Sequence, residues 1–263
     1  MQQHFFHFGT GDPIIWLHGF LGNGLNISGL ARGIHGSHYL LDARNHGRSF
    51  HSLGMGYDLL AKDLFEFMDL HEIKYASIVG YSMGAKTAIY ASGLQPWRFN
   101  KVVVIDAAPV DYTNILTSHY ENLYSYLYFM KDLKLEGKHR KEYEEEIDKK
   151  FKNPIITSLI SSNLRMNGAN SFEWRVNVDY LIEGLKEIPK WEENDRSFDG
   201  PAMAIVGEKS RHTCEFPGID VKDLYSKYLP ELQIEVILGT GHYLYIEKSK
   251  EVQEALSDFL SKF

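Results

Sequence analysis

Short apolar runs alternate along the chain with longer segments in which apolar residues recur at helical spacing. The strand-like runs cover residues 3–8, 13–17, 38–42, 75–79, 101–106, 201–206 and 234–238. Helices are predicted over residues 27–34, 57–70, 85–91 and 247–262. Continuously apolar runs are typical of strands buried on both faces of a parallel sheet, and their alternation with helices predicts an α/β fold. We therefore expect a mostly parallel central sheet flanked by helices.

Residues 111–195 break this alternation. They contain tyrosine-rich helical patterns and a highly charged run over 131–152, and they show no strand-like apolar run. The charged run is interpreted as a solvated helix face. We predict that residues 1–110 and 196–263 form the core of the molecule and that residues 111–195 form a helical cap over it.

Composition narrows the class of protein. A chain of 263 residues, 44% apolar and 24% charged, can bury the core of one globular domain. A net charge of -7 disfavours nucleic acid as a partner. The single cysteine, Cys214, excludes an internal disulfide and fits a reducing compartment. The first residues lack the pattern of a signal or transit peptide, and no apolar run is long enough to span a bilayer, so we expect a cytoplasmic location.

The segment Gly80-Tyr81-Ser82-Met83-Gly84 lies between a predicted strand and a predicted helix. Strand, G-x-S-x-G and helix together predict a nucleophile elbow, in which a tight turn exposes a reactive serine hydroxyl. Glycine at positions 80 and 84 removes side chains that would collide across the turn. A serine in an ordinary glycine-rich turn is the alternative interpretation.

A second loop predicts an anion-stabilising site beside that serine. The strand over 13–17 runs into His18-Gly19-Phe20, and a loop of this kind supplies a backbone donor in folds with a nucleophile elbow. We predict that the backbone N–H groups of Phe20 and Met83 form an oxyanion hole. His18 is expected to be structural, with the loop backbone as the active part.

The remaining members of a catalytic triad are expected at the carboxyl ends of other strands. His242 follows the last predicted strand and is the candidate general base for Ser82. Asp106 follows the strand expected beside the elbow strand, so it is the candidate acid. In most folds with a nucleophile elbow an aspartate is expected after the strand over 201–206, near position 210. Ser210 stands there instead, which favours Asp106 and leaves Glu208 as its rival.

Three further residues are candidates for contact with a substrate. His18, Tyr81 and Trp174 are candidate substrate-binding residues. The polar loop over 42–49 is interpreted as holding neighbouring loops together, with substrate contact as the less favoured alternative. The twelve histidines show no metal-binding spacing, and neither a phosphate loop nor a dinucleotide fingerprint is present, so no metal and no cofactor are expected.

Four segments, at residues 42–49, 80–86, 105–112 and 173–177, resemble one branch of the α/β-hydrolases. They read DARNHGRS, GYSMGAK, IDAAPVDY and EWRVN. The branch holds the bacterial YbfF-type esterases and the animal α/β-hydrolase domain-containing protein 11. The resemblance implies an α/β-hydrolase fold with a helical cap inserted after the sixth strand, and Asp106 as the triad acid. The chain departs from the branch at Ala85, where glycine is usual.

This resemblance implies a serine carboxylesterase that hydrolyses small acyl esters of short to medium chain length, with thioesters as a further possibility. One alternative is a non-hydrolytic lyase resembling the menaquinone-pathway enzyme. The other is a catalytically silent hydrolase fold that binds a ligand, which a broken triad or oxyanion loop would mark. The sequence does not determine the oligomeric state.

Overall fold

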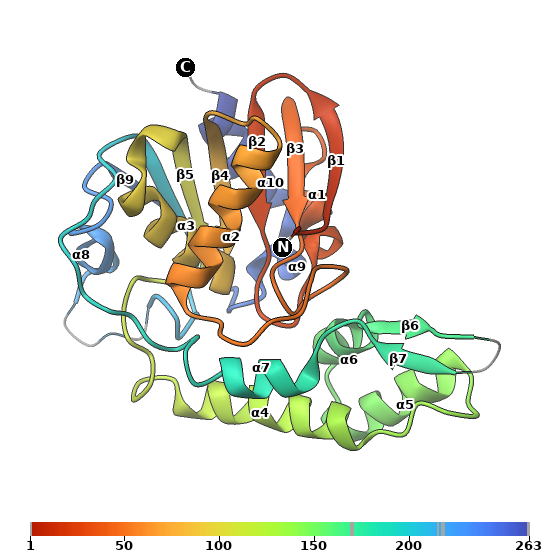
Figure 1. Ribbon diagram of the computed structural model, residues 1–263. Coiled ribbons are helices and arrows are strands. Elements are labelled where there is room, and N and C mark those ends of the chain that lie inside the picture. Colours follow the sequence, from red (N-terminus) through yellow and green to blue (C-terminus); the bar gives the residue numbers. More distant parts are fainter. Residues whose placement is uncertain (1, 169–170, 215, 217–218, 262–263) are drawn as a thin grey trace.

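The molecule is built on a seven-stranded sheet, shown in the computed structural model of Figure 1. The structure describes residues 2–168, 171–214, 216 and 219–261. The strand order is β1-β3-β2-β4-β5-β8-β9. The bounds are β1 (Phe5–Thr10), β2 (Pro13–Leu17), β3 (Gly36–Leu41), β4 (Ala76–Tyr81), β5 (Phe99–Ile105), β8 (Ala202–Gly207) and β9 (Leu232–Ile237). Only the β1–β3 pairing is antiparallel within this sheet, so the predicted mostly parallel sheet is confirmed.

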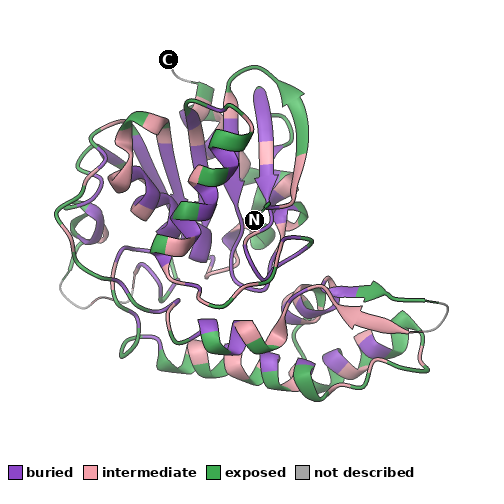
Figure 2. Ribbon diagram, viewed as in Figure 1, coloured by how far each residue is buried: buried purple, intermediate pink, exposed green. Residues whose placement is uncertain are grey.

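Helices cover both faces of the sheet, and each face has its own apolar cluster. One cluster includes α2 (Tyr57–Leu70), α3 (Met83–Leu94) and α8 (Val221–Tyr225). The other includes η1 (Gly24–Ile27), α1 (Ser28–Ala31), α9 (Leu244–Glu247) and α10 (Ser249–Ser261). A short 3₁₀ turn, η2 (Pro96–Arg98), precedes β5. The inner strands of the sheet are largely buried, as Figure 2 shows, whereas the edge strands β1 and β9 are partly exposed.

One predicted helix is much shorter than expected. Instead of a helix over 27–34, the chain forms the 3₁₀ turn η1 and a single helical turn, α1. Arg32 is already extended, at ψ 130°, and Gly33 follows at φ +87°, so the helix ends at Ala31. The apolar residues that suggested a longer helix pack in the same cluster as α10.

The insert leaves the sheet after β5 and forms a separate layer facing the carboxyl ends of the parallel strands (Figure 1). Its elements are α4 (Thr117–Asp132), α5 (Arg140–Phe151), α6 (Pro154–Ser161), β6 (Leu164–Met166), β7 (Phe172–Trp174) and α7 (Val178–Gly184). β5 is the fifth strand in chain order, so the predicted position after a sixth strand is wrong. The expectation of no strand here is also wrong, because β6 and β7 pair as a short antiparallel hairpin. Three-residue strands with mixed exposure leave no apolar run to detect.

A buried lysine ties both ends of the insert to the helix behind the serine. Lys86 of α3 donates to the carbonyl oxygens of Val110, Pro189 and Lys190 at 2.9–3.1 Å. Val110 precedes the insert helices and the other two follow them. Three aromatic rings surround the Lys86 Nζ atom, at 4.7–5.6 Å from their centroids: those of Tyr57, Tyr112 and Trp191. We call this arrangement the Lys86 clamp.

Within the described part of the chain, no helix combines the length and apolar character that a membrane span requires.

Candidate active site

Ser82 lies in the turn between β4 and α3, with a strained backbone at φ 53° and ψ -113°. A Cβ atom on Gly80 would lie 2.1 Å from the carbonyl oxygen of Gly84. One on Gly84 would lie 2.3 Å from the carbonyl oxygen of Leu17. Only glycine fits at either position, so the sequence G-x-S-x-G follows from the packing of this turn. Ala85, the departure from the branch pattern, is fully buried without disrupting the turn.

Ser82, His242 and Asp106 form one chain of hydrogen bonds. The Ser82 Oγ lies 3.0 Å from Nε2 of His242, and Nδ1 of His242 lies 2.7 Å from Oδ2 of Asp106. Asp106 follows β5, the neighbour of β4, and His242 follows β9. Because a carboxylate can only accept, Nδ1 carries the proton and Nε2 is free to accept from the Ser82 hydroxyl.

The carboxylate of Asp106 is fully buried and accepts four hydrogen bonds. The Gly207 N–H and the Thr213 hydroxyl donate to Oδ1, at 3.0 and 3.2 Å. The Ser210 hydroxyl donates to Oδ2 at 2.5 Å, beside His242. Ser210, which stands where an acid was expected, therefore contacts the acid from the neighbouring strand. These donors stabilise the charged carboxylate against the cost of burial.

Glu208, the rival acid, is exposed and lies apart from this chain of hydrogen bonds. Its carboxylate accepts from the backbone N–H of Gly239 at 2.7 Å. No hydrogen bond joins it to His242 in the described structure. The geometry therefore favours Asp106 over Glu208 as the partner of the imidazole.

Two backbone N–H groups remain available near Ser82. Neither the Phe20 N–H nor the Met83 N–H donates to an acceptor among the described residues. The loop that carries Phe20 lies against the serine, because a Cβ atom on Gly19 would be 3.3 Å from the Ser82 Cβ. Both donors proposed for an oxyanion hole are thus free to bind a ligand oxygen.

His18 holds this loop in place. Its Nδ1 lies 2.7 Å from the Gly19 carbonyl oxygen, and its Nε2 accepts from the Ala43 N–H at 3.0 Å. Burial lowers the pKa of His18, so the ring is neutral near pH 7. Both ring nitrogens are committed to backbone groups. His18 can contact a substrate only through the face or edge of its ring.

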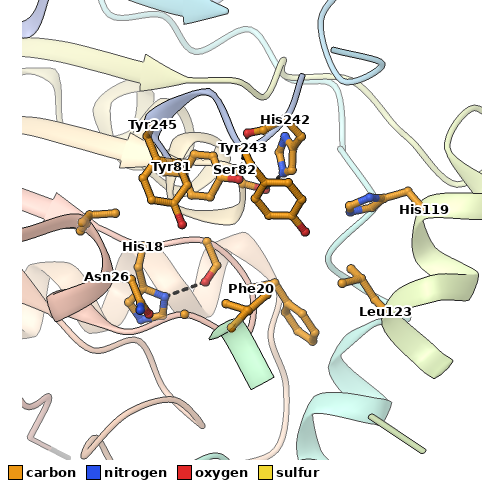
Figure 3. Close-up of a pocket in the computed structure, with 14 residues that line it drawn as sticks. His18, Phe20, Asn26, Tyr81, Ser82, His119, Leu123, His242, Tyr243 and Tyr245 are labelled. Atoms are coloured by element: carbon orange, nitrogen blue, oxygen red, sulfur yellow. Dashed lines mark hydrogen bonds between the residues drawn. The ribbon is translucent and has the colours of Figure 1, made fainter. Parts of the chain in front are cut away.

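The residues around Ser82 enclose a narrow pocket, shown in Figure 3. Its lining combines polar groups with apolar side chains: His18, Phe20, Asn26, Tyr81, His119, Leu123, Leu159, His242, Tyr243 and Tyr245. His119 and Leu123 approach from α4 of the insert (Figure 3). About 30 Å³ is open to the centres of water-sized molecules, which is room for roughly two waters. Only a small group fits in this space.

The other two predicted substrate contacts differ in placement. Tyr81 lines the pocket, but its hydroxyl donates to the carbonyl oxygen of His242 at 3.0 Å and so holds the loop of the base. Trp174 is not among the residues that line the pocket. Its indole N–H donates to the Met130 carbonyl oxygen at 2.8 Å, which fixes the β6–β7 hairpin to α4. Trp174 thus packs within the insert and does not line the pocket beside Ser82.

The candidate base His242 lies in a cluster with two other histidines, His119 and His212, which was not foreseen from the sequence. Ligand atoms of His119, His212 and His242 lie within 4.8 Å of one another. Burial lowers the pKa of His119 to about 3 and that of His212 well below its usual range, so both are neutral. The rings of His212 and His242 are stacked at 3.7 Å with 16° between their planes. Lone pairs in nearly parallel rings do not converge on one point, so we assign no metal to this cluster.

The polar loop over 42–49 holds loops together, as the favoured interpretation expected. Oδ1 of Asp42 accepts from the Gly24 N–H at 2.8 Å. Arg44 pairs with buried Asp63 through Nε and Nη2, at 2.6 and 2.7 Å. Nε2 of His46 accepts from the Leu21 N–H at 3.1 Å, which steadies the loop that carries Phe20. This loop acts on the pocket through the backbone that it positions.

Comparison with known proteins places the chain in a family. Residues 12–249 match the model of a family described as the alpha/beta hydrolase fold. The chain belongs to the α/β-hydrolase family. Esterase YbfF of Escherichia coli (strain K12) is 28% identical over 95% of this chain and 93% of its own length. The sn-1-specific diacylglycerol lipase ABHD11 of Danio rerio is 28% identical over 96% of this chain and 80% of its own length.

A solved structure described as a marine microorganism esterase superposes with a TM-score of 0.89 at 28% identity, covering 98% of this chain and 99% of that one. The predicted fold and the branch of YbfF and ABHD11 are both confirmed. The relatives in this branch are named as esterases and lipases.

Proposed function

We propose that this ester-hydrolysing enzyme is a serine carboxylesterase with Ser82, His242 and Asp106 as its catalytic triad. The observation that carries the proposal is the hydrogen-bonded chain from the Ser82 Oγ through His242 to Asp106, at 3.0 and 2.7 Å. Distances of this size allow proton transfer without rearrangement of the side chains. The narrow pocket beside the Ser82 hydroxyl supports the proposal, because an ester carbonyl bound there would lie within reach of the attacking oxygen.

In the first half of the reaction, the Ser82 Oγ attacks the ester carbonyl while Nε2 of His242 takes the hydroxyl proton. The negative charge moves to the carbonyl oxygen, where the N–H groups of Phe20 and Met83 stabilise it. The imidazolium then gives its proton to the departing alkoxide, and the alcohol leaves. An acyl group remains bonded to Ser82.

In the second half, a water molecule gives a proton to Nε2 of His242 and attacks the acyl carbon. The same backbone groups stabilise the second oxyanion, and the proton returns to the Ser82 Oγ as the acid leaves. Asp106 stays ionised throughout. Its role is to hold the imidazole in the tautomer that accepts at Nε2 and to stabilise the imidazolium.

The pocket supports an uncharged acyl group of short to medium length. Leu123 and Leu159 supply apolar walls, and His119 adds a neutral imidazole. The small open volume favours the short end of this range. A thioester carbonyl fits the same attack geometry, so thioesters belong to the proposed range.

Neither alternative function has a comparable observation in its favour. The lyase resembled by the elbow carries its acid after the strand that corresponds to β8, where this chain has Ser210 in contact with Asp106. A silent binding protein would have a broken triad or a blocked oxyanion loop. Here the hydrogen-bonded chain is complete, and both loop donors are free.

The test is hydrolysis of p-nitrophenyl esters from acetate to decanoate, together with labelling by a fluorophosphonate. Wild type is expected to hydrolyse acetate or butyrate fastest and to be labelled, whereas Ser82→Ala loses both properties. Ser158→Ala removes an exposed serine hydroxyl of α6 and serves as the matched control. Turnover that persists in Ser82→Ala would exclude Ser82 as the nucleophile. A complete lack of turnover and labelling in wild type would exclude the esterase.

A further inference from the structure

A second cavity lies between the core and the insert, away from Ser82. Arg48 and Asn23 line it from core loops, Asn26 lines it from η1, and Ser162 and Arg175 line it from the insert. We call it the arginine groove. Its volume is about 210 Å³, several times that left open beside Ser82. A cavity of this size can hold a small polar ligand.

Neither guanidinium in the groove has an acidic partner. No ion pair to Arg48 or Arg175 occurs within the described residues, although most other arginines are paired. The Arg48 guanidinium lies over the Phe6 ring, at 5.8 Å from its centroid. Burial lowers the pKa of Arg175, and the positive charges of Arg48 and Arg165 lower it further. The two arginines therefore repel each other across the groove.

Asp42 also lines the groove, but its carboxylate is already committed. Oδ1 accepts from the Gly24 N–H, and Oδ2 accepts from the Arg48 backbone N–H and contacts Nδ1 of His4, all at 2.8–2.9 Å. The negative charge of Asp42 attracts Arg175, but the two guanidinium groups of Arg48 and Arg175 share this one carboxylate. The groove thus keeps a surplus of positive charge at the junction of core and insert.

We propose that the arginine groove binds an oxyanion, either a carboxylate or a phosphate. Guanidinium groups present paired N–H donors whose spacing matches the oxygens of such groups. One arginine comes from the core and the other from the insert, so a bound oxyanion joins the two layers and removes their mutual repulsion.

Asn26 connects this groove to the proposed active site, since it lines both cavities. Its Oδ1 accepts from the Asn23 N–H at 2.7 Å, which leaves its amide N–H groups to face a ligand. The oxyanion can therefore be the charged end of an ester whose carbonyl lies at Ser82, or a separate ion. The first case rests on the proposed esterase function, whereas the second does not.

Direct binding tests the site without any turnover. Inorganic phosphate and glutarate are titrated calorimetrically into Ser82→Ala protein, alone and combined with Arg48→Gln or Arg175→Gln. We expect one or both anions to bind and each arginine substitution to weaken binding by about tenfold or more. Arg98→Gln, which removes an arginine paired with Asp69 far from the groove, is the control and is expected to leave binding unchanged.

Kinetics then identify the source of the oxyanion. The kcat/KM for the mono-p-nitrophenyl ester of glutarate is compared with that for p-nitrophenyl butyrate in the Ser82-containing proteins. If the oxyanion is the charged end of the substrate, Arg48→Gln and Arg175→Gln should each lower the ratio of kcat/KM for the glutarate ester to that for the butyrate ester about tenfold. If the oxyanion is a separate ion, both substitutions should leave this kcat/KM ratio unchanged. Phosphate binding should then still depend on both arginines.

Two results would overturn the site: no binding of either anion together with an unchanged ratio, or binding that is equal in all variants. If wild type does not hydrolyse p-nitrophenyl butyrate, the proposed esterase function is refuted, but the result of the anion-binding experiment still stands. The two proposals therefore fail separately.

Discussion

Replacing Asp106 by asparagine probes the triad most sharply, because the surrounding donors dictate how the new amide lies. The Gly207 N–H donates to Oδ1 and cannot be turned, so the asparagine oxygen must stay there. The asparagine NH₂ group is then forced to the Oδ2 position, facing Ser210 and His242. The Ser210 hydroxyl can rotate to accept. The imidazole can accept only by moving its proton from Nδ1 to Nε2.

That tautomer cannot take a proton from Ser82. We expect Asp106→Asn to lower kcat by about 10⁴-fold, equivalent to about 5.5 kcal/mol of transition-state stabilisation. Because the hydrogen bonds are replaced rather than lost, the free energy of unfolding is expected to fall by only about 1 kcal/mol. The assay is hydrolysis of p-nitrophenyl butyrate, with chemical denaturation run on the same protein.

Glu208→Gln is the matched control. It neutralises the rival carboxylate, which accepts an exposed hydrogen bond from the Gly239 N–H. We expect its kcat to stay within about twofold of wild type. Asp106→Asn with more than a tenth of the wild-type rate, or Glu208→Gln with the large loss, would refute the assignment of Asp106.

Three further predictions follow from groups around the elbow. Ser210→Ala removes one of four donors to Asp106 and is expected to lower kcat by about tenfold, with activity recovered in Ser210→Thr, both measured with p-nitrophenyl butyrate. Gly80→Ala places a Cβ atom 2.1 Å from a Gly84 oxygen and is expected to cost about 3 kcal/mol or more in unfolding free energy, whereas Ala85→Gly should cost about 1 kcal/mol. Burial lowers the pKa of Lys86 to about 7. The unfolded chain then binds more protons than the folded one between pH 7 and 10, so wild-type stability should rise with pH relative to Lys86→Met by up to about 1.4 kcal/mol per unit. A difference independent of pH over this interval would contradict that lowered pKa.

The fold and the elbow could be predicted because their signals are local. Apolar strands alternate with helices, and Gly80 and Gly84 are the residues that the tight turn requires. The position of Asp106 could be predicted because consecutive parallel strands usually lie side by side, as β4 and β5 do. The roles assigned to these residues in catalysis stay predictions, as do the cytoplasmic location and the division into core and cap.

Features that depend on side chains from distant segments could not be predicted. Ser210 and Thr213 reach Asp106 only because β8 lies beside β5. The stacking of His212 on His242 joins two loops that follow different strands. The sequence does not indicate that the indole N–H of Trp174 donates a hydrogen bond within the insert. The strands of the hairpin that contains it are too short to show an alternating apolar pattern.

The Lys86 clamp makes the insert exchangeable in principle. Three carbonyl oxygens, on Val110, Pro189 and Lys190, fix where the chain leaves the sheet layer and where it returns. The same side chain belongs to α3, the helix that begins directly after Ser82. A transplanted segment of any length that restores these two junctions would inherit the alignment of the serine turn. Chimeric proteins joined at these points would therefore exchange the pocket walls that the insert supplies while keeping the turn that carries Ser82.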